Sequence, residues 1–269
     1  MGNVDSSVIR SVRKALRLLD AFGGDHLDFG LTELSDHLGY PKSVTHKLVR
    51  TLMEAGFLEQ DAPTRRYHIG PGILTVAGAY LRCNPLVREG AAVLQDLARA
   101  TEHTAALGVL DRGEVLYVAA VEGTRAVKAS AHVGDRRPLH ATATGKILLS
   151  AMSDAEVDAL LGAHPLAALT PATITDRFQL KRGLDLVQQT GVAFNLRERS
   201  RDASGMAAAV YDLTGRVVAA ISLAFPATLQ DQRFLDELTK VVVAHAQELS
   251  RRLGAPARIP IAGGGERVG

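Results

Sequence analysis

The sequence has a single cysteine, Cys83, among its 269 residues. One cysteine excludes an intrachain disulfide framework and an all-cysteine zinc site. The chain has no uncharged apolar run of about 18 residues, so we expect no membrane-spanning helix. Its N-terminus lacks a basic segment followed by an apolar core, so no secretory signal is evident. These absences favour a cytoplasmic protein.

The chain also lacks a strong net charge, which is only +2, with 46% apolar and 22% charged residues. Such a composition is typical of a globular protein, and the length allows two domains. Residues 1–70 hold nine Lys/Arg and nine Asp/Glu. Nucleic-acid binding therefore depends on where the charges lie rather than on their sum.

No acidic residue lies between Lys42 and Arg50, in the second of two short helical patterns joined by Gly39-Tyr40-Pro41. Pro41 suits the first turn of that helix. Val44, Leu48 and Leu52 are spaced i, i+4, i+8, which predicts a narrow buried stripe. The opposite face is then cationic and rich in hydrogen-bond donors, as a helix in the DNA major groove requires.

A hairpin with a basic tip follows this helix. Residues 57–60 and 66–69 have the pattern of two short strands around the turn-rich segment 61–65. A basic hairpin directly after a basic helix predicts a winged helix-turn-helix rather than a merely solvated surface. The residues predicted to contact double-stranded DNA are Lys42, Ser43, Thr45, His46, Lys47, Arg50, Arg65, Arg66 and Tyr67. A winged helix that serves only protein interactions is the alternative.

Outside this winged helix-turn-helix segment, the patterns are first helical and then change to a mixture of hairpins and helices. Helices are predicted at 8–22, 71–83, 86–101, 140–150, 154–161, 175–190 and 230–253, and strands at 106–110, 115–118, 126–133, 206–212 and 217–225. Hairpins at both ends of the second domain indicate an α+β fold with an antiparallel sheet and flanking helices. We expect a DNA-binding domain at 6–70, linker helices at 71–101, a second domain at 102–253 and a flexible tail at 254–269.

Enzyme signatures are absent. No glycine-rich phosphate loop is present, and the serines Ser200, Ser204 and Ser222 lack a nucleophile-elbow context. His103, His132, His140 and Glu102 match no metal-ligand spacing. We expect a non-enzyme without cofactor or metal. Two alternatives are an enzyme domain, or a redox sensor based on Cys83 beside Arg82, fused to the winged helix.

Several segments resemble the IclR family of bacterial transcriptional regulators. They are VIRSVRKALRLLDAF (8–22), LTEL (31–34), LG (38–39), PKS (41–43), GFL (56–58), RY (66–67), IG (69–70), PLHATATGK (138–146) and GRVVAAIS (215–222). They span about residues 8–250 in the family's order. The resemblance implies a winged helix-turn-helix, a linker helix and a GAF-like effector-binding domain. It also implies homodimers that often pair into tetramers, promoter binding, and control of a catabolic operon, often as a repressor, by a small organic acid.

Carried over residue by residue, the resemblance implies an effector pocket. Its residues would be Ala126, Ala143, Thr144, Asn195, Gly205, Ser222 and Ala224. Helix N–H groups would hold a carboxylate there, while plain capping is the alternative role for Thr142 and Thr144. Val192, Asn195, Arg197-Glu198, Gly205, Ala209 and Ala224 depart from the family's usual residues. These departures indicate a roomier, less polar pocket for a larger, partly apolar effector such as an aromatic acid.

Overall fold

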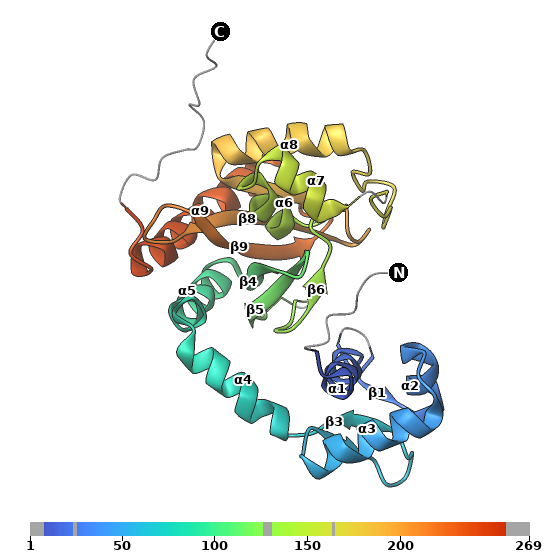
Figure 1. The fold of residues 1–269 in the computed structure, drawn as a ribbon. Helices are drawn as coiled ribbons and strands as arrows, with labels where there is room; N and C mark the ends of the chain where they lie inside the picture. The colour runs from blue at the N-terminus through green and yellow to red at the C-terminus, as the bar shows by residue number, and fades with distance from the viewer. Residues whose placement is uncertain (1–7, 24–25, 126–130, 163–164, 257–269) are drawn as a thin grey trace. The chain divides into compact units, whose positions relative to one another are not determined.

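A computed structural model describes residues 8–23, 26–125, 131–162 and 165–256. The chain divides into two compact units, Met1–Cys83 and Asn84–Gly269, and each is described by itself (Figure 1). Their boundary falls inside the predicted linker segment. Of the predicted tail, only 254–256 lie among the described residues. In the described parts of the chain, no helix is long and apolar enough to span a membrane.

The first unit is a winged helix-turn-helix. Its elements are α1 (Arg10–Asp20), β1 (Asp28–Phe29), α2 (Leu31–Leu38), α3 (Lys42–Glu54), β2 (Leu58–Gln60), β3 (Tyr67–Ile69) and α4 (Gly72–Cys83). The strands form an antiparallel sheet in the order β1-β3-β2. Leu18, Phe29 and Leu34 are fully or almost fully buried in its core. The two wing strands were predicted, whereas the two-residue strand β1 was not.

Helix α3 buries a different stripe from the predicted one. Thr45, Val49 and Leu52 are buried, while Val44 and Leu48 are only half-buried. The hydroxyl Oγ1 of Thr45 donates to Pro41 O at 3.4 Å within the same helix turn. Because that bond satisfies the hydroxyl, a threonine can face the core, and the helix turns by about one residue from the orientation that apolar spacing indicated.

The second unit is an α+β domain, as predicted. Its elements are α5 (Pro85–Thr101), β4 (Thr104–Asp111), β5 (Glu114–Val121), β6 (Arg136–Arg137), α6 (Ala143–Ser150), α7 (Asp154–Leu161), α8 (Arg177–Thr190), β7 (Val192–Leu196), β8 (Ala203–Tyr211), β9 (Val217–Pro226) and α9 (Gln232–Arg252). The sheet is antiparallel throughout, in the order β6-β5-β4-β9-β8-β7.

Two strand predictions need comment. The strand predicted at 126–133 falls largely outside the described residues, and 131–133 are not in a strand. The strand that pairs with β5 on that side is β6, at 136–137. Strand β7 was missed, because it follows α8 with only Gly191 between them. Gly191 has a φ of +68°, in the left-handed region that glycine favours.

Helices cover both faces of the sheet (Figure 1). One face packs Met206, Ile221 and Phe225 against α5 and α9. The opposite face packs Ala207 and Ala220 against α6 and α8, and α7 extends this layer beside β5. Strand residues alternate between the two faces. The strand alternation therefore decides which side chains meet the start of α6.

The outer side of β7 is occupied by side chains. Gly191 O accepts a hydrogen bond from Ala209 N, so by antiparallel alternation Val192 and Phe194 direct their backbone groups away from β8. Thr190 Oγ1 lies 3.4 Å from Val192 N and 3.2 Å from Val192 O. Lys146 Nζ donates to Phe194 O at 2.9 Å. Val192 N, Val192 O and Phe194 O are therefore satisfied without a further strand.

His103, one of the residues weighed for an enzyme site, is a core residue. It is 2% exposed, and its ring lies 5.9 Å from that of Phe225 and 5.8 Å from that of Phe234, between centroids. Its Nε2 is buried and has no hydrogen-bond partner among the described residues. Burial, helped by the nearby Arg125 guanidinium, lowers the pKa of His103 from 6.5 to about 4. The ring is therefore neutral when folded.

We expect acid to destabilise the second unit through His103. Below pH 6.5 the unfolded chain binds a proton that the folded chain does not accept until about pH 4. The free energy of unfolding should fall by about 2 kcal/mol between pH 7 and pH 5. His103→Phe should remove that part of the pH dependence, because phenylalanine does not titrate. Urea unfolding of the parent protein and of the His103→Phe variant at pH 7 and pH 5 measures this difference. If the free energy of unfolding falls equally in the two proteins, the loss belongs to groups other than His103.

Candidate DNA-binding face and effector pocket

The exposed face of α3 carries most of the predicted DNA contacts. Lys42, Ser43, His46, Lys47 and Arg50 are all exposed. Arg50 Nε pairs with Glu54 Oε1 at 3.2 Å, with both side chains more than two-thirds exposed. Such a solvated pair contributes little and is easily exchanged for a phosphate. The N-terminal half of α3 therefore presents donors and positive charge to solvent.

The two wing arginines differ in their surroundings. Arg65 is exposed at the tip, with a φ of +59°, in a turn where Asp61 Oδ2 accepts from Thr64 N at 2.8 Å. The hydrogen bonds that the Thr64 hydroxyl and the Thr64 N–H donate to Asp61 lower the pKa of Asp61. Arg66 instead pairs with Asp28 Oδ1 at 2.6 Å and Glu33 Oε2 at 2.9 Å. Arg65 is thus available to a phosphate, whereas Arg66 ties the wing to β1 and α2.

Two predicted DNA contacts are placed in the core. Thr45 is 0% exposed and Tyr67 is 7% exposed. Neither side chain can reach a base edge without unpacking the unit. The predictions that Thr45 and Tyr67 contact DNA are therefore wrong, because both side chains are buried. Sequence reasoning also missed a feature at Tyr40, whose ring lies 5.2 Å from Lys14 Nζ and 5.9 Å from Arg17 Cζ. This cation–π contact places two cations of α1 beside Tyr40, two positions before the start of α3.

The second unit has a narrow cavity of about 50 Å³, partly open to solvent, beside the start of α6. Its floor is a row of paired residues across four strands: Thr104 with Ala224, Ala224 with Gly205, and Gly205 with Asn195. Ala224 and Gly205 occupy little space in the middle of this row. All the predicted pocket residues except Ala126 line this cavity: Ala143, Thr144, Asn195, Gly205, Ser222 and Ala224. Ala126 lies outside the described residues.

Helix α6 directs its N-terminus at this cavity. Thr142 is the N-cap, and its Oγ1 accepts from Gly145 N at 3.1 Å. Among the described residues, the N–H groups of Ala143 and Thr144 have no acceptor. Thr144 Oγ1 is buried without a partner as well. Thr142 therefore does the capping, while Thr144 leaves a hydroxyl and an N–H beside a cavity that it lines.

Glycines make this arrangement of Thr144 and α6 possible. A Cβ on Gly108 would lie 2.5 Å from Thr144 Cγ2, and a Cβ on Gly145 would lie 2.1 Å from Leu139 O. The absence of side chains there lets α6 approach both β4 and the chain before it. A single close packing arrangement thus orients the start of the helix.

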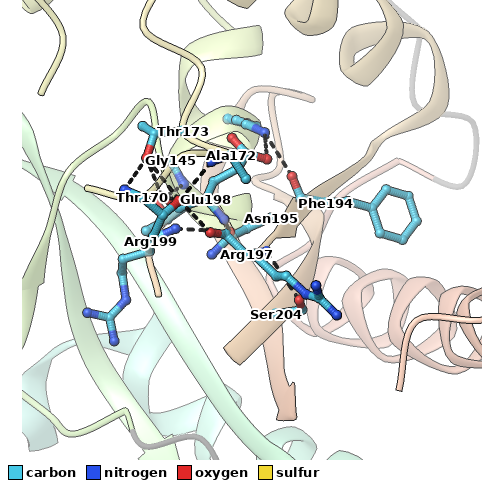
Figure 2. A network of polar contacts seen from close by, with 12 residues as sticks. Gly145, Thr170, Ala172, Thr173, Phe194, Asn195, Arg197, Glu198, Arg199 and Ser204 are labelled. Carbon is cyan, nitrogen blue, oxygen red and sulfur yellow. Dashed lines mark hydrogen bonds and ion pairs between the residues drawn. The ribbon is translucent and has the colours of Figure 1, made fainter. Parts of the chain in front are cut away.

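A polar network secures the loop after β7 at the cavity's rim (Figure 2). Asn195 Oδ1 accepts from Glu198 N at 2.8 Å, and Thr173 Oγ1 donates to Glu198 O at 2.6 Å. Lys146 Nζ lies 2.5 Å from Glu198 Oε1, with both side chains about nine-tenths buried. Glu198 Oε2 has no partner in the described part of the chain. Asn195 therefore organises the loop and need not contact an effector with its Oδ1.

Two arginines at the cavity were missed by sequence reasoning. Arg137 from β6 and Arg199 from the loop after β7 both line it, and its described lining contains no Asp or Glu. Arg137 lies directly before Pro138 of the recognised PLHATATGK segment. Its position next to that segment could have indicated that Arg137 lies at the pocket. The direction of its side chain depends on the pairing of β5 with β6, which the sequence spacing did not reveal.

The residues weighed for an enzyme or redox site do not come together. His140 Nε2 lies 3.0 Å from Ala167 O, whereas His132 is exposed, with Nδ1 4.0 Å from Glu122 Oε1. Cys83 is an exposed free cysteine. Over the ranges that the structure describes, no three His, Cys, Asp or Glu side chains form a metal-binding group.

Comparisons with known proteins agree with both units. The IclR helix-turn-helix domain model matches residues 11–62, and the model of the bacterial transcriptional regulator IclR C-terminal domain matches residues 78–251. The Escherichia coli regulator XynR is 31% identical, over 93% of this chain and 99% of its own. The E. coli transcriptional repressor IclR is 28% identical, over 91% of this chain and 90% of its own.

Solved structures agree as well. An IclR-type regulator from Alicyclobacillus acidocaldarius superposes with a TM-score of 0.83 at 25% identity, over 92% of this chain and all of that one. An IclR homologue from Microbacterium hydrocarbonoxydans, complexed with 4-hydroxybenzoate, has a TM-score of 0.75 at 23% identity, over 90% of this chain and 99% of that one. The latter likeness is one of fold alone. With both domain models matched in order, this chain belongs to the IclR family of bacterial transcriptional regulators, which are DNA-binding proteins and not enzymes.

Proposed function

We propose that this regulator is a cytoplasmic repressor whose hold on promoter DNA changes when a small organic acid occupies the cavity at α6. The observation that carries the proposal is the start of α6, where two N–H groups and the Thr144 hydroxyl have no partner among the described residues and lie beside a cavity. Helix N-termini bind carboxylates through such donors. Residues 6–70 would bind DNA, 71–101 would link, and 102–253 would sense the acid.

The lining of the cavity favours an acid with an apolar skeleton. Gly205, Ala224, Ala106 and Ala143 are small, and Tyr117 adds apolar wall. We therefore propose an acid with an apolar part, such as an aromatic acid, rather than an acid of two or three carbons. 4-Hydroxybenzoate, the ligand of the Microbacterium structure, is a suitable first probe.

We infer that the active species is a homodimer or a dimer of dimers. Helix α4 has no buried residue within its unit, and Leu74, Val76, Tyr80 and Leu81 are between 41% and 69% exposed. A second copy would cover this apolar face, and a symmetric dimer suits a palindromic operator. Sedimentation of Leu74→Glu should show monomer, and an undisturbed dimer would contradict this assignment.

Arg65→Ala should weaken binding to every DNA sequence and lower the slope of log affinity against log salt by about one. The exposed wing-tip guanidinium would contact a phosphate, which carries no sequence information. His46→Ala should instead reduce the preference for the specific operator by about 1–3 kcal/mol, if it reads a base edge. Fluorescence anisotropy on operator and scrambled DNA measures both.

Arg233→Ala is the matched control for Arg65→Ala, because Arg233 is 88% exposed on α9 and pairs only with Glu237 in the described part of the chain. It should leave DNA affinity unchanged. Equal losses from the Arg65, His46 and Arg233 variants would contradict the division of roles. A salt-independent affinity would support the protein-interaction alternative.

Thr144→Val should raise the stability of the empty protein by about 1 kcal/mol and weaken acid binding about tenfold. Valine keeps the shape of threonine but removes a buried hydroxyl that has no partner. Thermal unfolding with and without 4-hydroxybenzoate measures both effects. Thr239→Val is the control, because that hydroxyl already bonds Leu235 O at 2.7 Å within α9. If no acid changes DNA affinity or unfolding temperature, the proposed function fails.

A further inference from the structure

The charge around the cavity is one-sided. Its lining includes Arg137 and Arg199, and none of the described lining residues is Asp, Glu, Lys or His. The start of α6 adds the partial positive charge of a helix N-terminus. A ligand with a single carboxylate would satisfy the start of α6 but leave an arginine facing the cavity.

Arg137 is held in place from behind. Its Nη2 donates to Asp135 Oδ2 at 2.6 Å, and its Nη1 donates to Arg136 O at 3.0 Å. Asp135 Oδ2 also accepts from His132 N at 3.1 Å. Asp135 is not part of the cavity lining, whereas Arg137 is. The carboxylate therefore orients the guanidinium without occupying the ligand's side.

The guanidinium retains binding capacity. An arginine has five N–H donors in a planar fork, and two of the five in Arg137 are used by the described residues. The side chain is only 19% exposed, so water solvates the remaining donors poorly. A charged acceptor inside the cavity would gain charge-assisted hydrogen bonds from them.

We propose that the effector carries two acidic groups, one bound at the start of α6 by Ala143 and Thr144, and the other bound by Arg137. This inference rests on the proposed function, since it names the class of acid that the same cavity senses. The apolar residues Ala106 and Ala203 would contact the carbon skeleton between the two groups. The chemical class is a dicarboxylate, aromatic or aliphatic.

Matched acids test the proposal by calorimetry on the full chain. Terephthalate is compared with benzoate and with monomethyl terephthalate, which keeps the size but has one acidic group. Adipate and hexanoate form the aliphatic pair. We expect each diacid to bind about 10–100-fold more tightly than its partner, as charge-assisted hydrogen bonds to a poorly solvated arginine would give.

Arg137→Met should abolish this preference and leave benzoate affinity within about threefold. The change removes the arginine that pairs with Asp135. If the single variant unfolds for that reason, the double variant Asp135→Asn/Arg137→Met is used for the same measurement. Arg136→Met is the control: Arg136 lies on the same short strand but pairs with Asp111 and Glu114 and does not line the cavity. It should retain the full preference.

The outcomes separate the two proposals. Monoacids that bind as tightly as their diacid partners overturn the two-acid inference and leave an acid sensor intact. Equal losses for monoacid and diacid in the Arg137 variants also overturn it, because Arg137 would then not be a separate anion site. No binding by any of the acids would instead overturn the proposed function itself.

Discussion

Gly145→Ala is expected to destabilise the second unit by about 3 kcal/mol or more. A Cβ at this position would lie 2.1 Å from Leu139 O and 2.5 Å from Leu139 Cα. Both are backbone atoms, so no side-chain rotation relieves the overlap, and α6 must move from its start. Because Ala143 and Thr144 belong to the same helix turn, acid binding should be lost as well. Chemical unfolding and calorimetry measure the two effects.

Gly183→Ala is the matched control in the same unit. Gly183 lies within α8, and a Cβ there meets nothing within 4 Å. Alanine is about 1 kcal/mol more favourable than glycine inside a helix, so this variant should be slightly more stable than the parent. A Gly145→Ala chain as stable as Gly183→Ala would show that α6 does not begin against Leu139.

Lys146→Met is expected to cost about 3–5 kcal/mol, the usual penalty for leaving one partner of a buried ion pair uncompensated. Glu198 is 7% exposed, and its Oε2 already lacks a partner. Without the ammonium, the loop that Glu198 anchors at the cavity's rim should loosen. The unfolding temperature should fall by about 10 °C.

Adding Glu198→Gln to Lys146→Met should recover part of the loss, because the buried charge is then gone, and a double-mutant cycle gives the coupling energy. Lys181→Met is the control. Lys181 pairs with Asp158 at 2.8 Å and Asp154 at 3.5 Å, but both carboxylates are more than half exposed, so the change should cost less than about 1 kcal/mol. Equal costs for the two lysines would mean that the Lys146–Glu198 pair is effectively solvated.

Sequence periodicity predicted the larger architecture correctly and the side-chain directions less well. Alternating and helical patterns separated the hairpins from the helices of the second unit. In α3, stripes one residue apart differ by only about 100° of rotation, and apolar spacing favoured Val44 where the core contains Thr45. Thr45 can face the core because its hydroxyl is hydrogen-bonded, and such a bond is not visible in a hydrophobicity pattern.

The cavity shows a similar division. The family resemblance named Thr144, Asn195 and Ser222, which the structure brings around one cavity. Arg137 was not predicted, because its direction depends on the pairing of Arg137 with Val115, 22 positions away in the chain. The departures from the family pattern at Gly205 and Ala224 predict a roomier effector pocket. The charge that lines that room comes from residues outside the recognised motifs.

The occupied outer side of β7 also bears on how the protein behaves at high concentration. An open sheet normally offers its last strand as a template for another molecule, which leads to strand swapping and fibrous aggregates. Here the Thr190 hydroxyl bonds both backbone groups of Val192, and the Lys146 ammonium bonds the carbonyl of Phe194. At the other end of the sheet, β6 has only two residues. The ammonium that stabilises the loop at the cavity thus also protects the protein against self-association through its sheet.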